Sequence, residues 1–101
     1  MFQLSESVNY CRALTKDKKE NIISKQLIRS RTSIGANVEE AIGGFSKKYF
    51  YRKLTISYKE ARKSHYWIRL LFDTGYLSIE EKIDLINDCE EILKTLRDKQ
   101  L

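Results

Sequence analysis

Three polar residues could bring acid–base or metal chemistry together if helices hold them close: Asn37, Glu40 and Glu60. Two glutamates on facing helices can bind a cation, as they do in carboxylate helix bundles. Such sites add Glu-x-x-His repeats, whereas the single histidine here, His65, follows Glu60 by five residues. That spacing does not place both side chains on one helix face. We therefore expect Asn37, Glu40 and Glu60 to form a structural polar network, and His65 to be a packed or interfacial imidazole.

Nucleophilic catalysis finds no better support. Ser30, Ser33 and Ser57 have no histidine base near them in the sequence, and no glycine-rich phosphate loop is present. The pair Gly43-Gly44 resembles a helix stop. We therefore expect a protein that is not an enzyme and that needs no cofactor or metal.

Cations are the strongest functional signal. Lys47 and Lys48 occupy the first turn of an expected helix, where the macrodipole disfavours them unless they help to bind an anion. Such residues would contact phosphates without reading sequence, and Tyr49 and Tyr51 could stack on unpaired bases. The expected nucleic-acid-binding residues are Arg29, Arg31, Lys47, Lys48, Arg52, Lys53, Lys59, Arg62, Lys63 and Arg69. The alternative is that these cations are solvated or paired with nearby glutamates and the acidic C-terminal segment.

The charge distribution along the chain is uneven. Residues 1–72 hold 15 Lys and Arg against 6 Asp and Glu, whereas residues 73–101 hold 4 against 8. A basic surface of this kind suits a polyanion. The N-terminus has no signal-peptide pattern and no apolar run is long enough for a membrane span, so we expect a cytoplasmic protein with Cys11 and Cys89 reduced.

The elements that position these residues are predicted to be helices, because the 101 residues contain no proline and only four glycines. Apolar periodicity predicts helices over roughly Phe2 to Thr15, Asn21 to Ile42, Ser46 to Thr74 and from Ser78 onward. Gly43-Gly44 and Gly75 are expected to end helices in the left-handed conformation, Ser46 to cap one, and Ser78 with Glu81 to form a capping box. We predict an all-α, antiparallel up-down-up-down four-helix bundle that forms a single domain over residues 1–101.

The expected core follows these periods. The stripes are Ile23, Leu27, Ile34, Val38 and Ala41; then Phe50, Leu54, Ser57, Ala61, Ile68 and Leu71; then Ile79, Ile83, Ile86, Leu93 and Leu96. The third helix has further aromatic residues beside its stripe, including Tyr58, Tyr66 and Trp67. These three are expected to lie in a subunit interface, since Tyr and Trp favour interfaces, unless long Lys and Arg stems cover the rings.

The two central helices also resemble a known family. The motif residues are Ser33, Ile34, Ala36, Asn37 and Glu40, then Ser46, Lys47, Phe50, Lys53 and Leu54, then Lys59, Glu60, Ala61, Tyr66 and Trp67. Over Gln26 to Tyr76 the chain resembles bacterial four-helix-bundle proteins encoded in 23S rRNA intervening sequences, a family related to accessory proteins of diversity-generating reverse transcriptases. The resemblance implies a homo-oligomer, typically a pentamer, with a basic surface proposed to bind nucleic acid.

Together these observations predict a non-enzymatic oligomeric bundle that binds structured RNA or DNA electrostatically. The alternative is an adaptor or scaffold, for example for a nucleic-acid-processing protein, with no direct nucleic-acid contact. A continuous basic surface would favour the first function, and scattered paired cations the second.

Overall fold

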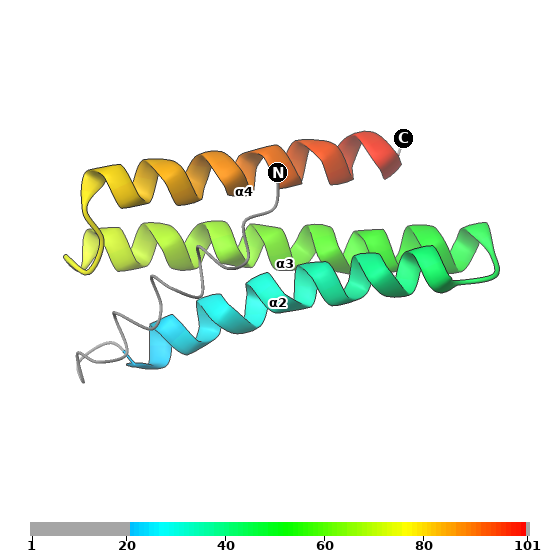
Figure 1. The fold of residues 1–101 in the computed structure, drawn as a ribbon, viewed down its shortest axis with the longest axis horizontal. Helices are drawn as coiled ribbons and strands as arrows, with labels where there is room; N and C mark the ends of the chain where they lie inside the picture. Colours follow the sequence, from blue (N-terminus) through cyan, green and yellow to red (C-terminus); the bar gives the residue numbers. More distant parts are fainter. Residues whose placement is uncertain (1–20, 101) are drawn as a thin grey trace.

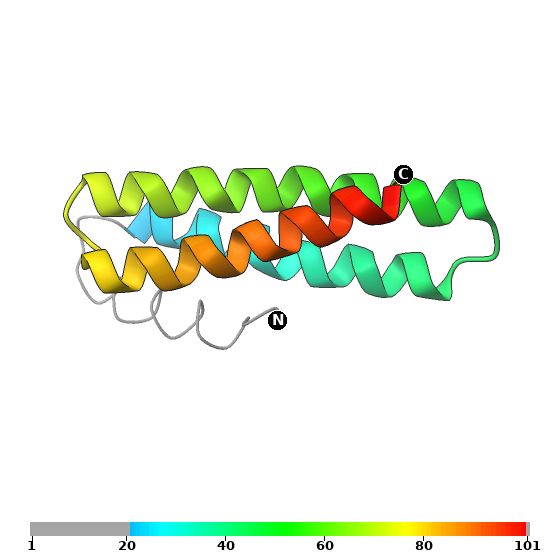
Figure 2. The ribbon, with the colours of Figure 1, turned by 90° about the horizontal axis from the view of Figure 1, so that it is seen from above.

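The computed structural model describes residues 21–100, and the regular structure in this range is entirely helical. Its helices are α2 (Asn21–Gly43), α3 (Lys47–Asp73) and α4 (Ile79–Gln100). They lie along one long axis, and α3 packs against both α2 and α4 (Figures 1 and 2). These bounds confirm the predicted second, third and fourth helices. The predicted first helix, the loop after it and Cys11 lie outside the described residues. No helix in the described range is long and apolar enough to cross a membrane.

Side-chain caps fix where α3 and α4 begin. The Ser46 hydroxyl oxygen accepts the Tyr49 backbone N–H at 3.1 Å. At α4, the Glu81 N–H donates to Ser78 Oγ at 3.1 Å, while the Ser78 N–H donates to Glu81 Oε1 at 2.8 Å. This reciprocal pair is the predicted capping box. Each cap contributes about 0.5–2 kcal/mol, because it satisfies backbone donors that a helix leaves free.

The two predicted glycine stops use different geometry. Gly75 has φ +88°, and beside it the Tyr76 N–H donates to the Leu71 carbonyl at 2.9 Å and the Gly75 N–H to the Phe72 carbonyl at 3.0 Å. This is a Schellman cap, in which glycine carries no steric cost. The prediction of a left-handed conformation at Gly43-Gly44 was wrong, since Gly75 is the only described residue with positive φ. Instead, α2 ends with a hydrogen bond from the Gly44 N–H to the Ala41 carbonyl, three residues earlier, at 3.3 Å.

Gly44 is required for space rather than for its backbone freedom. A Cβ built on Gly44 would lie 2.1 Å from Cδ1 of the Tyr49 ring, whereas a Cβ on Gly43 meets nothing within 4 Å. We expect Gly44→Ala to lower the free energy of unfolding by about 1–2 kcal/mol, because Tyr49 must move. Gly43→Ala is the matched control and should be neutral or slightly stabilising, since alanine favours helix. Urea denaturation of both variants checks this, and equal effects would contradict it.

The core has two apolar clusters at opposite ends of the bundle. One contains Leu27, Ile68, Leu71, Leu77, Leu85 and Cys89, and the other contains Ala41, Leu54 and Leu96. The predicted stripes of α2 and α3 supply most of these side chains. On α4 the prediction was partly wrong, because Ile79 and Ile83 are 50% and 49% exposed while Leu85 and Cys89 are buried. The buried face of α4 is therefore rotated from the predicted stripe.

Polar residues are buried among the apolar ones. The Ser57 hydroxyl donates to the Ile34 carbonyl of α2 at 3.0 Å, and the Cys89 thiol donates to the Ala61 carbonyl at 3.2 Å. Such contacts require small side chains on α3, so that α2 and α4 can both approach its backbone. Arg31 of α2 is fully buried and forms an ion pair with Asp88 of α4. This pair joins the two helices that flank α3.

The buried Cys89 thiol should be chemically inert. Burial raises its pKa from 9.0 to about 11, with Arg31 acting in the opposite direction and Asp88 and Glu90 adding to the rise. Because the folded thiol holds its proton where the unfolded one loses it, stability from this group is intact below pH 9. It is lost as pH rises toward 11, by up to about 2–3 kcal/mol.

Measuring the free energy of unfolding across this pH range tests the prediction. The Cys89→Ala variant is the control, because it has no thiol to titrate and should lack this part of the loss in stability. In a Cys11→Ser background, maleimide labelling at neutral pH should require unfolding. Rapid labelling of the native protein would contradict the prediction.

Candidate nucleic-acid interface

The outward side of α3 carries a row of cations. Each exposed member has another member three, four or seven residues away, a spacing that places residues on one side of a helix. At 100° per residue they occupy about a third of the helix circumference. We call this set the cationic ridge: Lys48, Arg52, Lys59, Arg62, Lys63 and Arg69. The whole of α3 contains eight Lys and Arg but only two acids, Glu60 and Asp73. The ridge therefore runs along nearly the full length of the helix.

Most of the ridge is not neutralised by carboxylates of residues 21–100. Of its six cations, only Lys63 forms an ion pair with a carboxylate of residues 21–100, to Glu60 at 3.4 Å. That pair is weak, because the Lys63 side chain is 64% exposed and water screens it. Arg52 and Arg69 instead lie over tyrosine rings, at 5.6 Å and 5.8 Å from the ring centroids. These contacts hold the guanidinium groups without cancelling their charge.

The predicted cations near the start of α3 differ in their exposure to solvent. Lys47 and Lys48 are exposed in the first turn, beside a helix terminus with no acidic residue. Lys53 is turned inward, with its side chain 19% exposed and an ion pair to Glu40 at 3.1 Å. It also lies 5.4 Å from the centroid of the Tyr49 ring. Lys47 therefore extends the ridge, whereas Lys53 fastens α3 to α2.

Two of the predicted phosphate-binding residues, Arg29 and Arg31, lie on α2, and the structure contradicts the prediction for Arg31. Arg29 is exposed and belongs to a different helix from the ridge. Arg31 is fully buried against Asp88, so its prediction as a surface phosphate contact was wrong. No local pattern predicts this pair, because the two partners are 57 residues apart. Arg31 therefore joins α2 to α4 inside the bundle, and most of the exposed predicted cations lie on α3.

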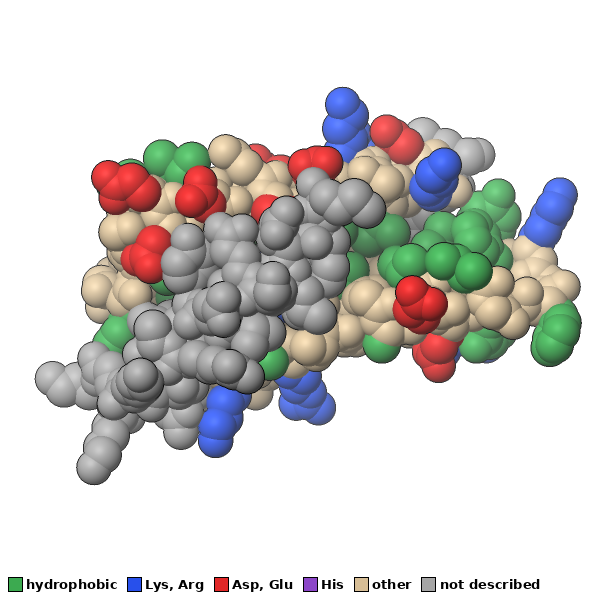
Figure 3. Space-filling model, viewed as in Figure 1, with side chains coloured by type: hydrophobic (Ala, Val, Ile, Leu, Met, Phe, Trp, Pro, Cys, Tyr) green, Lys and Arg blue, Asp and Glu red, His purple; other side chains and the backbone are tan. Residues whose placement is uncertain are grey.

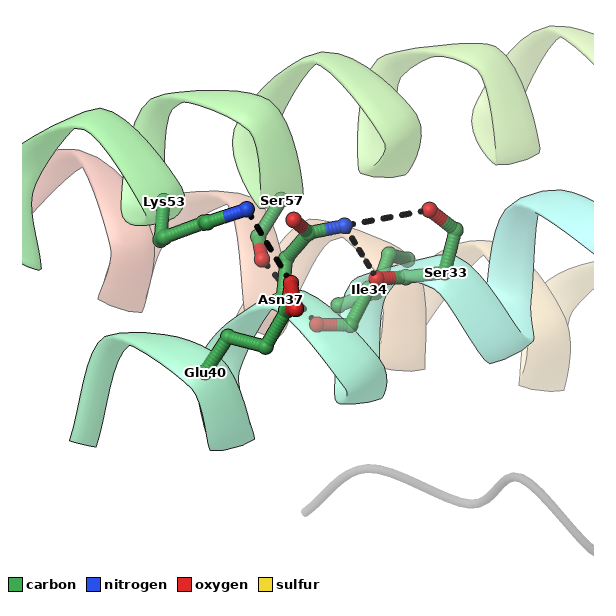
Figure 4. Close-up of polar contacts among 6 residues, drawn as sticks. All are labelled: Ser33, Ile34, Asn37, Glu40, Lys53 and Ser57. Atoms are coloured by element: carbon green, nitrogen blue, oxygen red, sulfur yellow. Dashed lines mark hydrogen bonds and ion pairs between the residues drawn. The ribbon is translucent and has the colours of Figure 1, made fainter. Parts of the chain in front are cut away.

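The predicted polar network separates into individual contacts (Figure 4). The Asn37 amide donates to the Ser33 carbonyl at 2.9 Å and to Ser33 Oγ at 3.2 Å, both within α2. Glu40 bridges from α2 to Lys53 of α3, while Glu60 pairs with Lys63 along α3. Each glutamate thus has a lysine partner of its own. Nowhere in residues 21–100 do three His, Cys, Asp or Glu side chains gather as a metal site would require.

The three predicted interface aromatics differ in their surroundings. Tyr58 is half-buried and packs on the Ala41, Leu54 and Leu96 cluster. Trp67 is half-buried and packs on the other cluster, so both contribute to folding of the chain itself. Tyr66 is 49% exposed and stands among the ridge cations.

An apolar groove lies on another side of the molecule, between α2 and α4 near the hairpin end. It encloses about 660 Å³ and is lined by Ile34, Val38, Ile42, Phe50, Leu54, Ile92 and Leu96, among others. Figure 3 shows apolar side chains gathered there, while acidic ones cluster where α4 begins. The groove was not predicted, since Ile34, Val38, Phe50, Leu54 and Leu96 of its lining were expected in a closed core.

Comparisons with known proteins agree with the helical architecture. The model of the 23S rRNA-intervening sequence protein family matches residues 1–98. A crystal structure of a protein of unknown function from the S23 ribosomal protein family of Bacteroides thetaiotaomicron is 40% identical in sequence. The two superpose with a TM-score of 0.92, over 96% of this chain and 90% of the other. No curated protein matches the chain. The chain belongs to the 23S rRNA-intervening sequence protein family.

Proposed function

We propose that this protein binds structured RNA or DNA electrostatically, without catalysis, through the cationic ridge of α3. The observation that carries the proposal is that five of the six ridge cations have no carboxylate partner among residues 21–100. Solvated cations that merely aid solubility are usually mixed with acids along a helix face, as they are on α4. A row with one charge sign instead matches the phosphates of a nucleic acid strand.

The ridge suits phosphate contact more than sequence readout. Lysine and arginine side chains along one helix side fix the position of a backbone, whereas specificity requires contacts to base edges. The affinity should therefore depend steeply on salt and weakly on duplex sequence.

We further propose that the protein works as a homo-oligomer, with the pentamer implied by the family resemblance as the expected assembly. Exposed apolar side chains such as Ile42, Phe45 and Ile56 are available for such contacts.

Fluorescence anisotropy with a labelled RNA hairpin and a matched DNA duplex tests the proposal. We expect binding that weakens linearly with the logarithm of salt concentration, with a slope of about −0.9 for each duplex phosphate contacted. Light scattering of the same sample gives the subunit number. A well-folded protein that binds neither probe at low salt would refute the proposed function.

An adaptor function is the second candidate, and the apolar groove favours it. Apolar grooves of this kind accept amphipathic helices from other proteins. The two functions use different surfaces, since the groove lies between α2 and α4 and the ridge on the outward side of α3. Val38→Glu, directed at the groove, should leave nucleic-acid binding unchanged if the ridge carries the function.

A further inference from the structure

A hollow between α3 and α4 adjoins the cationic ridge. It encloses about 590 Å³, is open to solvent, and combines three ridge cations, Arg62, Lys63 and Arg69, with two aromatic rings, Tyr66 and Trp67. Glu90 of α4 lies on its opposite wall. Pockets for small ligands have volumes of roughly 300–1,000 Å³, so the hollow has room for one nucleotide. Its lining joins cations to an aromatic surface at one place.

The aromatic wall is rigid on one side and open on the other. Trp67 is packed against the core, and its ring centroid lies 5.0 Å from that of Tyr66 at an interplanar angle of 65°. Tyr66 is 49% exposed, so part of its ring remains in contact with solvent. A flat ring in contact with a half-buried neighbour that packs on the core is a suitable platform for stacking a planar ligand.

Hydrogen bonds orient the cation beside this platform. Arg69 Nε donates to His65 Nδ1 at 3.0 Å. Because Nδ1 accepts this bond, the neutral imidazole carries its proton on Nε2, which lies 3.4 Å from Glu90 Oε2. The contacts from α4 through His65 therefore hold the Arg69 guanidinium over the Tyr66 ring, 5.8 Å from its centroid. Neither Arg62 nor Arg69 forms an ion pair with a carboxylate in the part of the chain that the structure describes.

We propose that this hollow holds one unpaired nucleotide, with its base stacked on Tyr66 and its phosphate bound by Arg62 and Arg69. Glu90 supplies an acceptor for an amino group of the base or a hydroxyl of the sugar. The inference rests on the proposed function and narrows it, because a base can reach Tyr66 only when it is not paired in a duplex. The preferred partner is then a single strand, or a looped region of a structured nucleic acid.

A second copy of the chain related by a two-fold axis is a poor occupant for the hollow. A two-fold contact at the hollow would bring its three cations against the same three cations of the partner, and such like-charge contacts are strongly unfavourable. We therefore assign Tyr66 to the nucleic-acid surface rather than to a two-fold contact between copies.

Trp67 is the only tryptophan in the chain and lies in the hollow, so its fluorescence reports on occupancy. The test is to titrate the wild-type protein with oligo(U), with oligo(dT) and with a blunt duplex of equal length at one salt concentration. Both single strands should quench Trp67 fluorescence, and the duplex should bind with little quenching. Equal quenching by strands and duplex would overturn the inference.

Three variants that keep every charge of the chain test whether the Tyr66 ring stacks on a base. Tyr66→Ala should weaken single-strand binding by about 5- to 150-fold, as expected for loss of one stacked base, and should leave duplex binding almost unchanged. Tyr66→Phe should restore the affinity, because it keeps the ring. Ile83→Ala is the control, since Ile83 is 49% exposed like Tyr66 but lies on α4 and does not line the hollow. If Tyr66→Ala binds single strands like the wild type, the hollow is excluded while the proposed function stands. If neither strand nor duplex binds any variant or the wild type, both proposals fail.

Discussion

Replacing Asp88 with alanine is expected to lower the free energy of unfolding by about 3–5 kcal/mol, the usual cost of removing one partner from a buried ion pair. Arg31 is fully buried and the Asp88 side chain is only 8% exposed, so water cannot replace the lost carboxylate. A domain of this size has only about 5–15 kcal/mol of stability in total, and much of it would be lost. Urea denaturation followed by circular dichroism measures the change.

The chain contains its own control for this prediction. Arg97 and Asp98 form another arginine–aspartate pair, at 3.7 Å, but both side chains are more than half exposed. Asp98→Ala should therefore change stability by less than about 1 kcal/mol. The double variant Arg31→Met with Asp88→Leu should be more stable than Asp88→Ala alone, because no buried charge then loses this partner. Equal effects of Asp88→Ala and Asp98→Ala would show that the buried pair does not organise the bundle.

The second large effect is expected on nucleic-acid affinity. Replacing the ridge residues Lys48, Arg52 and Lys59 with glutamine should reduce the salt slope on a duplex by about 2.7, that is 0.9 for each of three phosphate contacts. Affinity at low salt should fall by roughly tenfold or more, with little dependence on the sequence of the probe. The three side chains are exposed, so the helical content should not change.

A matched variant controls for net charge. Replacing Lys94, Arg97 and Lys99 with glutamine also removes two lysines and one arginine, but from α4. If binding depended only on net positive charge, both triple variants would lose the same nucleic-acid affinity, because each lowers the net charge by three. Loss of a defined surface would affect only the ridge variant. Equal weakening of the two would therefore exclude the ridge as the binding surface.

The helix boundaries were predictable because local residues determine them. Ser46, the Ser78 and Glu81 box, and Gly75 all act within a few positions of the helix end that they form. The stripes on α2 and α3 were also predictable, since each has one dominant apolar side. Position on the ridge follows from the same periodicity, which places six of the ten predicted cations together on one side of α3.

The errors arose where several helices decide the outcome together. On α4 the apolar residues form two overlapping stripes, and periodicity alone cannot tell which stripe faces α3. Packing buries Leu85 and Cys89 and leaves Ile79 and Ile83 exposed. Burial of Arg31 depends on Asp88 in a distant helix, and no local pattern announces a partner so far along the chain. Gly44 was recognised as a break, but its close approach to Tyr49 became visible only in three dimensions.

Lysine footprinting in the presence of RNA tests the central claim most directly, because it needs no substitution in the protein. An amine-reactive reagent modifies exposed lysines, and mass spectrometry compares each site with and without a saturating RNA hairpin. We predict strong protection of Lys48, Lys59 and Lys63 on the ridge and little protection of Lys94 and Lys99, which are also exposed but lie on α4. Protection of the α4 lysines instead, or no protection of the ridge lysines in a complex that has formed, would contradict the account.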